Sequence, residues 1–408
     1  MKEKSYMIAI PDSMEELKDI KGIMDRLSNS SQIKLISHEF DEGMKLKLEV
    51  NGVEYKALMS PVDVEISQML RLQHFFPDVD IEKLRETEYG LLLEMEFGTD
   101  SIASYHAQLK ILTNLIPNPV AILDGSSEKI LSGKWAKLAA ASDVPPAPRY
   151  IYIVQAVSGK EDCVWLHSHG LNRCGIPELE ILNSTKDMYQ SHYSIIETMA
   201  SRLIELEAQP QPLEPFYLAR VTENIPMIAT LIDWEEAVAN YPEDMIGGKK
   251  DRKEDHNENT CGIFVYASPE DLENEEYSPV SIFDEYLKEN PIYMLSNKET
   301  DRMRRLAAER LPYMLKAAED EENVILVKIG LEVDEEFKEE GEEWEHIWFE
   351  LIDIEDGKVR CELTQEPYFV KDMHEGSEGV YTFDKITDWI IYTKEQQITP
   401  DDVYLMEL

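Results

Sequence analysis

One hairpin limits what this chain can fold into more than any other feature of its sequence. Apolar residues alternate with charged ones from Met44 to Val50, which is the pattern of a strand with one buried face. Asn51-Gly52 then joins this segment to residues 53–59 (VEYKALM), and Asn-Gly supplies the positive φ angles of a two-residue turn. The sequence therefore predicts two adjacent antiparallel strands.

Helices and strands alternate irregularly around this hairpin. A strand at 5–10 is followed by a helix from Ser13, where Ser13 and Glu16 have the spacing of a capping box and apolar residues recur at helical spacing up to Leu27. Further helices are predicted at 64–75, 101–116 and 187–206, and further strands at 90–97, 119–124, 149–157 and 162–168. This order predicts the α+β fold class, with an antiparallel sheet that carries helices on one face in the N-terminal region.

Charge divides the chain into unequal halves. Residues 1–206 hold 31 acids and 21 bases, whereas residues 207–408 hold 51 acids and 19 bases, a net charge of −32. A shift of this size often marks a domain boundary, and the proline-rich segment 207–215 (EAQPQPLEP) is the predicted linker. The expected regions are an α+β domain at 1–206 with an internal break near 142–148, a mixed α+β region at 216–318 and a small mainly-β domain at 320–408.

A basic cluster lies in the helix predicted from about residue 297, which Pro312 is expected to bend or break. The cluster consists of Arg302, Arg304, Arg305 and Arg310. Two interpretations stay open, ion pairing with neighbouring acids or a site for an anion or a partner.

The last region is predicted to be mainly β-structure. Its strands are expected at 324–333, 345–354, 358–363, 379–383 and 386–392. Asp356-Gly357 has the composition of a hairpin turn between two of them. Several short strands broken by turns indicate a small barrel or a curled sheet.

The net charge of −42 limits the partners of the chain. Such a field repels phosphate backbones and anionic lipid, so we expect no nucleic acid and no membrane partner, and a basic protein is the class of partner that the charge favours. The four cysteines form no C-x-x-C pair, and the N-terminus has too short an apolar run for a signal peptide. A cytoplasmic location is the simplest expectation, and no oligomeric state is predicted.

Three short segments of the last region carry a family resemblance. They are Glu345–Glu350 (EHIWFE), Glu366-Pro367 and Ile386–Trp389 (ITDW). In this order they resemble the YegJ-like family of bacterial proteins, a domain of unknown function. Residues 167–180 are similar to an HxHGxxRxGxPE-type motif of other uncharacterised bacterial families, some of whose members look like immunity or antitoxin-type proteins.

His167 and His169 are the candidate metal ligands. They alternate on a predicted strand, so both imidazoles project from one face, and two such histidines can hold a metal ion when Glu178 or another third ligand approaches. The alternative is a binding or structural turn shaped by the two nearby glycines, with Arg173 as a further candidate binding residue.

Trp348, Trp389, Glu366 and Asp388 are the candidate binding residues of the last region. The tryptophans could pack in a core or form a ligand platform, and the two carboxylates could form a polar edge.

The common motifs for nucleotide binding, zinc proteolysis and α/β-hydrolase chemistry do not occur in the sequence. We therefore expect an uncharacterised bacterial protein that acts by binding or interaction, on the immunity-like pattern, rather than by catalysis, and no cofactor is predicted. The alternatives are a metal-dependent enzyme that uses His167 and His169, or small-ligand or peptide binding by the C-terminal β domain.

Overall fold

The chain forms two compact units. The computed structural model describes residues 3–66, 76–160, 162–205, 210–222, 225–252, 259–288, 297–338 and 344–406. The first unit consists of residues 1–141 and 145–296, and the second of residues 142–144 and 297–408. Most of the helix predicted at 64–75 and the start of the predicted linker lie outside the described residues. No helix in the described ranges is long and apolar enough to cross a membrane.

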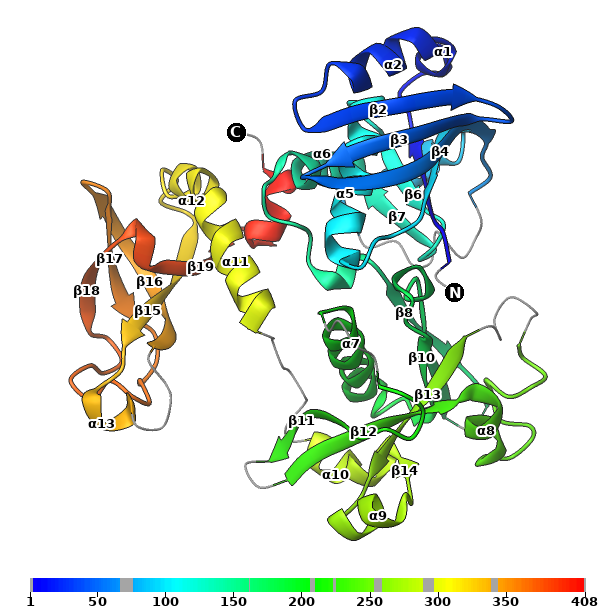
Figure 1. The fold of residues 1–408 in the computed structure, drawn as a ribbon. Coiled ribbons are helices and arrows are strands. Elements are labelled where there is room, and N and C mark those ends of the chain that lie inside the picture. The colour runs from blue at the N-terminus through cyan, green and yellow to red at the C-terminus, as the bar shows by residue number, and fades with distance from the viewer. Residues whose placement is uncertain are drawn as a thin grey trace. The chain divides into compact units, whose positions relative to one another are not determined.

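The first unit begins with an antiparallel sheet in the order β2-β3-β4-β5-β1-β6-β7 (Figure 1). Its strands are β1 (Ser5–Ile10), β2 (Ile33–Phe40), β3 (Met44–Val50), β4 (Val53–Asp63), β5 (Tyr89–Met95), β6 (Ala121–Asp124) and β7 (Lys129–Ser132). The predicted hairpin is confirmed, because Val50 pairs with Val53 and the turn residues Asn51 and Gly52 have φ angles of 51° and 81°. Leu46 and Leu48 are buried, as the alternation requires.

Helices pack against this sheet. They are α1 (Met14–Lys18), α2 (Ile20–Ser28), α4 (Ile81–Leu84), α5 (Ser101–Leu115) and α6 (Gly133–Ala141). Helix α5 contacts both α2 and α6, and its predicted apolar residues Tyr105, Leu109 and Leu112 are fully buried. The predicted α+β class is confirmed.

The prediction of one continuous helix after Ser13 is wrong. Ser13 occupies the N-cap of α1, but its side chain makes no capping hydrogen bond. The helix then breaks at Asp19, whose carboxylate accepts a hydrogen bond of 2.9 Å from the backbone N–H of Gly22 and so caps α2. An aspartate can satisfy free backbone N–H groups locally, and this competes with continuation of the first helix.

A mixed sheet completes the first unit, in the order β11-β12-β13-β10-β9-β8. Its strands are β8 (Ile153–Ser158), β9 (Cys163–His169), β10 (Glu178–Thr185), β11 (Phe216–Thr222), β12 (Ile225–Asp233), β13 (Thr260–Tyr266) and the short β14 (Ser278–Pro279), and its helices are α7 (Tyr189–Glu205), α8 (Trp234–Ala239), α9 (Pro269–Asn274) and α10 (Asp284–Leu287). Strand β10 pairs with β13 in parallel, so strands from both sides of the predicted linker share one sheet. The three-domain division stays a prediction.

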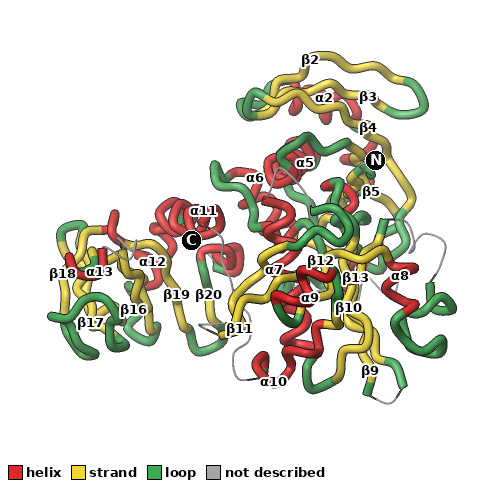
Figure 2. The backbone as a smooth tube through the Cα atoms, turned by 60° about the horizontal axis from the view of Figure 1, so that its bottom comes forward, coloured by secondary structure: helices red, strands yellow, loops and turns green. Residues whose placement is uncertain are grey.

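The second unit is an antiparallel sheet in the order β18-β17-β16-β15-β19-β20, with helices beside it. Its elements are α11 (Asn297–Glu309), α12 (Leu311–Ala317), β15 (Val324–Glu332), α13 (Glu335–Lys338), β16 (Trp344–Glu355), β17 (Lys358–Leu363), β18 (Glu378–Thr382), η5 (Phe383–Lys385), β19 (Ile386–Tyr392), β20 (Gln397–Ile398) and η6 (Pro400–Leu405). Figure 2 shows α11 next to β19, which it contacts. The predicted break at Pro312 is confirmed, because Pro312 lies in the first turn of α12.

The alternative of a small barrel is wrong for this unit. Strands β18 and β20 end the sheet on opposite sides and do not pair with each other within the described ranges. Strand β20 has only two residues, and a closed barrel needs edge strands long enough to pair along a tilted seam. The predicted hairpin turn is confirmed, since Asp356 and Gly357 have φ angles of 50° and 74°.

Candidate functional site

The two motif histidines are neighbours on β9. The ring centroids of His167 and His169 lie 5.0 Å apart at an interplanar angle of 79°, and the indole of Trp165 stacks on His167 at 4.0 Å. His167 is buried in the first unit. Among the described residues, no group of three or more His, Cys, Asp or Glu side chains is placed to hold a metal ion. A metal bound by these histidines stays a prediction, which elemental analysis of untagged protein and its His167→Ala variant would test.

Glu178 organises the turn that follows the histidines. Its carboxylate accepts hydrogen bonds from the hydroxyl of Ser168 at 2.6 Å and from the backbone N–H groups of Gly170 at 2.9 Å and Asn172 at 3.0 Å. Burial raises the pKa of Glu178, whereas the hydrogen bonds from these donors lower it in part. Gly170 has a φ of 109°, a conformation that favours glycine, so the structure gives this part of the motif a shaped turn.

Arg173 lies in the interior of the first unit. Its guanidinium donates two hydrogen bonds to the carboxylate of Asp124, at 2.9 and 2.8 Å, and a third to the hydroxyl of Ser5. The side chains of Arg173 and Asp124 are 1% and 0% exposed, so no solvent reaches the pair. The ring of Tyr105 lies 5.2 Å from the guanidinium carbon and covers it. Arg173 therefore joins β6 to the segment after β9 rather than facing a ligand.

Trp389 and Asp388, two candidates from the second unit, are both buried. The indole of Trp389 is 0% exposed and donates a hydrogen bond of 3.0 Å to the carbonyl of Ala307 on α11. Asp388 accepts a hydrogen bond from the backbone N–H of Trp389. Trp389 thus takes part in the packing of α11 on the sheet.

The charge on Asp388 makes the second unit less stable above about pH 6. Burial raises its pKa to about 6, against the opposing effects of the Trp389 N–H and of Lys328. A pKa that is higher in the folded than in the unfolded state contributes stability at low pH, and this contribution is lost as the pH rises through 6. We expect Asp388→Asn to be more stable than the wild type above that pH by about 1–3 kcal/mol, and equal to it near pH 4. Chemical denaturation across this range measures the difference, with Glu350→Gln, a change at an exposed residue of the same sheet, as the matched control.

The other two candidates lie at the surface of the second unit. The ammonium group of Lys328 lies 5.4 Å from the ring centroid of the half-buried Trp348. Glu366 is exposed and accepts a hydrogen bond of 3.1 Å from the His374 imidazole, which lowers the pKa of Glu366. Trp348 and Asp388 flank Lys328 from the strands on either side of β15, whereas Glu366 lies in the loop after β17.

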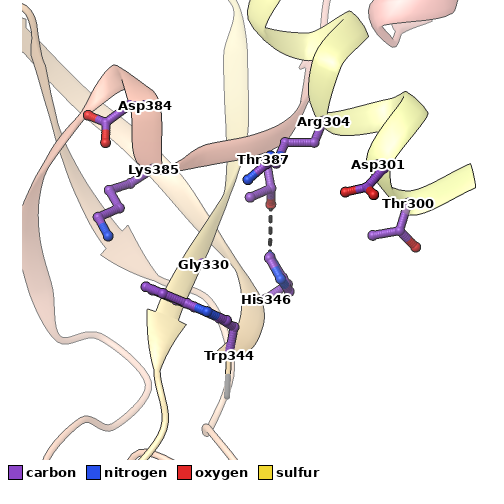
Figure 3. A pocket seen from close by; sticks show the side chains of 9 residues that line it. All are labelled: Thr300, Asp301, Arg304, Gly330, Trp344, His346, Asp384, Lys385 and Thr387. Carbon is purple, nitrogen blue, oxygen red and sulfur yellow. Dashed lines mark hydrogen bonds between the residues drawn. The ribbon is translucent and has the colours of Figure 1, made fainter. Parts of the chain in front are cut away.

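A pocket of about 410 Å³ lies in the second unit, and none of those four candidates lines it (Figure 3). Helix α11 contributes Thr300, Asp301 and Arg304, strands β15 and β16 contribute Gly330, Trp344 and His346, and the segment from η5 into β19 contributes Asp384, Lys385 and Thr387. Figure 3 shows the side chain of Arg304 extending from the helix toward Thr387, with His346 directly below. The pocket therefore combines residues from four separate parts of the chain.

Three cations lie in or near this pocket. Arg304 and Lys385 line it, and Lys328 is close enough to act on the charge of His346. The ammonium group of Lys385 lies 4.7 Å from the ring centroid of Trp344. Within the described part of the chain, none of the three cations forms an ion pair, although acids outnumber bases in the sequence by 82 to 40.

The arginine cluster of α11 is divided between two roles. Arg302 forms ion pairs with Glu299 at 2.7 Å and with Asp401 at 3.0 Å, and Arg310 donates to the carbonyl of Pro400 at 2.6 Å. Internal pairing, one of the two interpretations, is thus confirmed for Arg302. Arg304 lines the pocket instead.

Thr387 and Gly330 lie against the imidazole of His346. The Thr387 hydroxyl donates a hydrogen bond to the carbonyl of Lys328 at 3.1 Å, and Nδ1 of His346 lies 3.1 Å from the same hydroxyl oxygen. Gly330 pairs with His346 across the strands, and a Cβ atom at Gly330 would lie only 3.2 Å from Cε1 of the imidazole. Burial, Lys328 and Arg304 together lower the pKa of His346, so its imidazole is neutral at pH 7.

The sequence contained a signal for part of this pocket. Trp344, His346 and Trp348 alternate on one strand, and the last two belong to the EHIWFE segment, which Trp344 directly precedes. Alternation places such side chains on one face of a strand. Lys385 and Thr387 had no comparable signal, because their position depends on the pairing of β19 with β15 and on the irregularity in its register.

Comparison with known families divides the chain into three matched stretches. Residues 5–146 match the N-terminal model and residues 154–264 the C-terminal model of a protein of unknown function, DUF4026. Residues 307–403 match an uncharacterised protein conserved in bacteria, DUF2314. No curated protein and no solved structure matches the chain. The expectation of uncharacterised bacterial families is thus confirmed.

Proposed function

We propose that the second unit is a binding module for a small anionic ligand and that the chain acts by binding rather than by catalysis. The observation that carries this proposal is the set of three cations, Arg304, Lys328 and Lys385, around one pocket without an ion-pair partner in the described ranges. A cation that is left without a carboxylate partner in so acidic a chain is available to an anion from solution.

The strong negative charge of the chain does not prevent this binding. At physiological ionic strength, charges separated by more than about 8 Å are largely screened in solvent, so the nearest groups decide which ions enter a pocket. Arg304 and Lys328 lie close enough to His346 to lower its pKa, which indicates a positive local potential. Asp301 and Asp384 also line the pocket and balance part of this charge.

The size of the pocket fits a small molecule. Its volume of about 410 Å³ is within the range of roughly 300–1,000 Å³ that is usual for small-ligand sites. Trp344 supplies an aromatic wall, and Lys385 holds its ammonium group over that ring. The volume and the aromatic wall therefore suit a small ligand.

Replacing Arg304 with glutamine should weaken anion binding about tenfold, because one charge-assisted contact is lost. Isothermal titration calorimetry of the full chain with inorganic phosphate and with citrate, at low ionic strength, measures the change. Arg305→Gln is the matched control, since it removes the same charge from the same helix outside the pocket lining. Equal effects of the two substitutions, or no binding to the wild type, would contradict the proposal.

A basic protein partner is the second candidate function, and the net charge of −32 on residues 207–408 favours it. An immunity-like role and membership of the YegJ-like group would both agree with such a partner. The test is a pull-down with the full chain at low and then at high salt. A basic protein that is released by high salt supports this candidate. If the Arg304→Gln variant still binds that protein, the protein does not bind through the anion pocket.

A further inference from the structure

The hydrogen bonds around Thr387 decide which nitrogen of His346 carries the proton. A hydroxyl has one hydrogen, and Thr387 uses it to donate to the carbonyl of Lys328. The Thr387 oxygen can then only accept from His346, so Nδ1 of the imidazole must be the protonated nitrogen. In the neutral imidazole Nε2 consequently carries a lone pair, and it forms no hydrogen bond with a described residue.

Every element around the pocket carries charged residues. Helix α11 contributes Arg304 and Asp301, β15 contributes Lys328 and Glu332, η5 contributes Lys385 and Asp384, and β19 contributes Asp388. The cations attract an anion. The unprotonated Nε2 and the carboxylates of Asp301 and Asp384 are hydrogen-bond acceptors, so they repel an anion that has no hydrogen atom to donate. A ligand that satisfies both groups must bring negative charge and a donor hydrogen together.

We propose that the ligand is a phosphate monoester, bound with a proton between one phosphate oxygen and Nε2 of His346. This proposal rests on the proposed function of the same pocket. A phosphate monoester has a second pKa of about 6, so it can carry charge and a hydroxyl at once near neutral pH. A sulfate group stays fully ionised and offers no hydrogen to Nε2. The acidic carboxylates of the lining then accept from hydroxyl groups elsewhere in the ligand.

The proton balance of binding follows from these charge states. At about pH 7.5 the free phosphate monoester is a dianion and His346 is neutral, so neither brings the shared proton. The complex therefore takes one proton from solvent, and no covalent bond forms or breaks. Binding should tighten as the pH falls toward about 6 and should level off below that value, where the free ligand already carries the proton.

The test is isothermal titration calorimetry of the full chain with glycerol 3-phosphate, inorganic phosphate and sodium sulfate. At about pH 7.5 we expect both phosphates to bind about tenfold more tightly than sulfate, with roughly one proton taken up. Titration in two buffers of different ionisation enthalpy measures the proton uptake.

Two variants separate the role of His346 from a merely structural one. His346→Asn keeps a donor for Thr387 and removes Nε2, so proton uptake and the preference for phosphate should both disappear. Thr387→Val frees the imidazole to place its proton on Nε2, so phosphate and sulfate should bind equally well.

Binding of phosphate and sulfate to the wild type with equal affinity and without proton uptake overturns this inference but leaves the anion pocket in place. Failure of every anion to bind overturns the proposed function itself.

Discussion

Arg173→Met should destabilise the first unit by about 3–5 kcal/mol, because it removes the guanidinium that is ion-paired and hydrogen-bonded to the buried Asp124 carboxylate. Asp124 is 0% exposed and receives two hydrogen bonds from the guanidinium. Water cannot replace these donors at a site so deeply buried. Urea denaturation, followed by circular dichroism of the full chain, measures the loss as an earlier transition of the first unit.

Arg360→Met is the control for this prediction. Arg360 is 46% exposed and faces Asp353 and Glu378 at the surface, where such pairs contribute about 0–1 kcal/mol. A second variant, Arg173→Met combined with Asp124→Leu, removes both charges and should recover part of the stability. Equal stability of Arg173→Met and Arg360→Met would show that the buried pair is not needed for the fold.

The Arg173 ion pair also connects two parts of the chain that match different family models. Asp124 and Ser5 belong to the stretch at 5–146, and Arg173 to the stretch at 154–264. Their shared hydrogen bonds lie inside the first unit. We therefore expect the loss of Arg173 to affect both stretches in one cooperative transition.

Trp389→Ala should destabilise the second unit by about 3–5 kcal/mol, the usual cost of removing a large aromatic side chain from a core. Trp389 is 0% exposed, and its hydrogen bond to Ala307 links β19 to α11. The same change also leaves the Ala307 carbonyl without this donor. Thermal unfolding monitored by tryptophan fluorescence measures the effect as a lower Tm for the second unit.

Trp344→Ala is the matched control, because Trp344 is 43% exposed. It should change the stability by less than about 1 kcal/mol. If the two tryptophan variants melt at the same temperature, Trp389 does not hold α11 against the sheet.

Local patterns were sufficient for much of the fold. The turns at Asn51-Gly52 and Asp356-Gly357 have the positive φ angles that their residue types favour, and residues 44–50 follow the predicted alternation. The break at Pro312 also follows from one residue. The apolar pattern did not show the helix break at Asp19, because it continues across the local hydrogen bond by which Asp19 caps the second helix.

The site was harder to predict than the fold. The histidine motif at 167–180 was conspicuous in sequence, yet Arg173 takes its partner from Asp124, and Glu180 takes its partner from Arg252 at 2.7 Å. Spacing within a motif cannot show such distant partners. The pocket of the second unit was not visible in the sequence, since its lining residues form no contiguous motif.

The sequence by itself determined the α+β class, the local hairpins and the excess of negative charge in the second half. Only the tertiary structure decided which charged groups are neutralised and which remain available. Arg302 and Arg304 are two residues apart on α11, and such positions lie about 200° apart around a helix. One side chain therefore meets Glu299 and Asp401, whereas the other lines the pocket beside His346. The amino-acid composition cannot distinguish these two arginines, because ion pairing depends on distances between residues far apart in the chain.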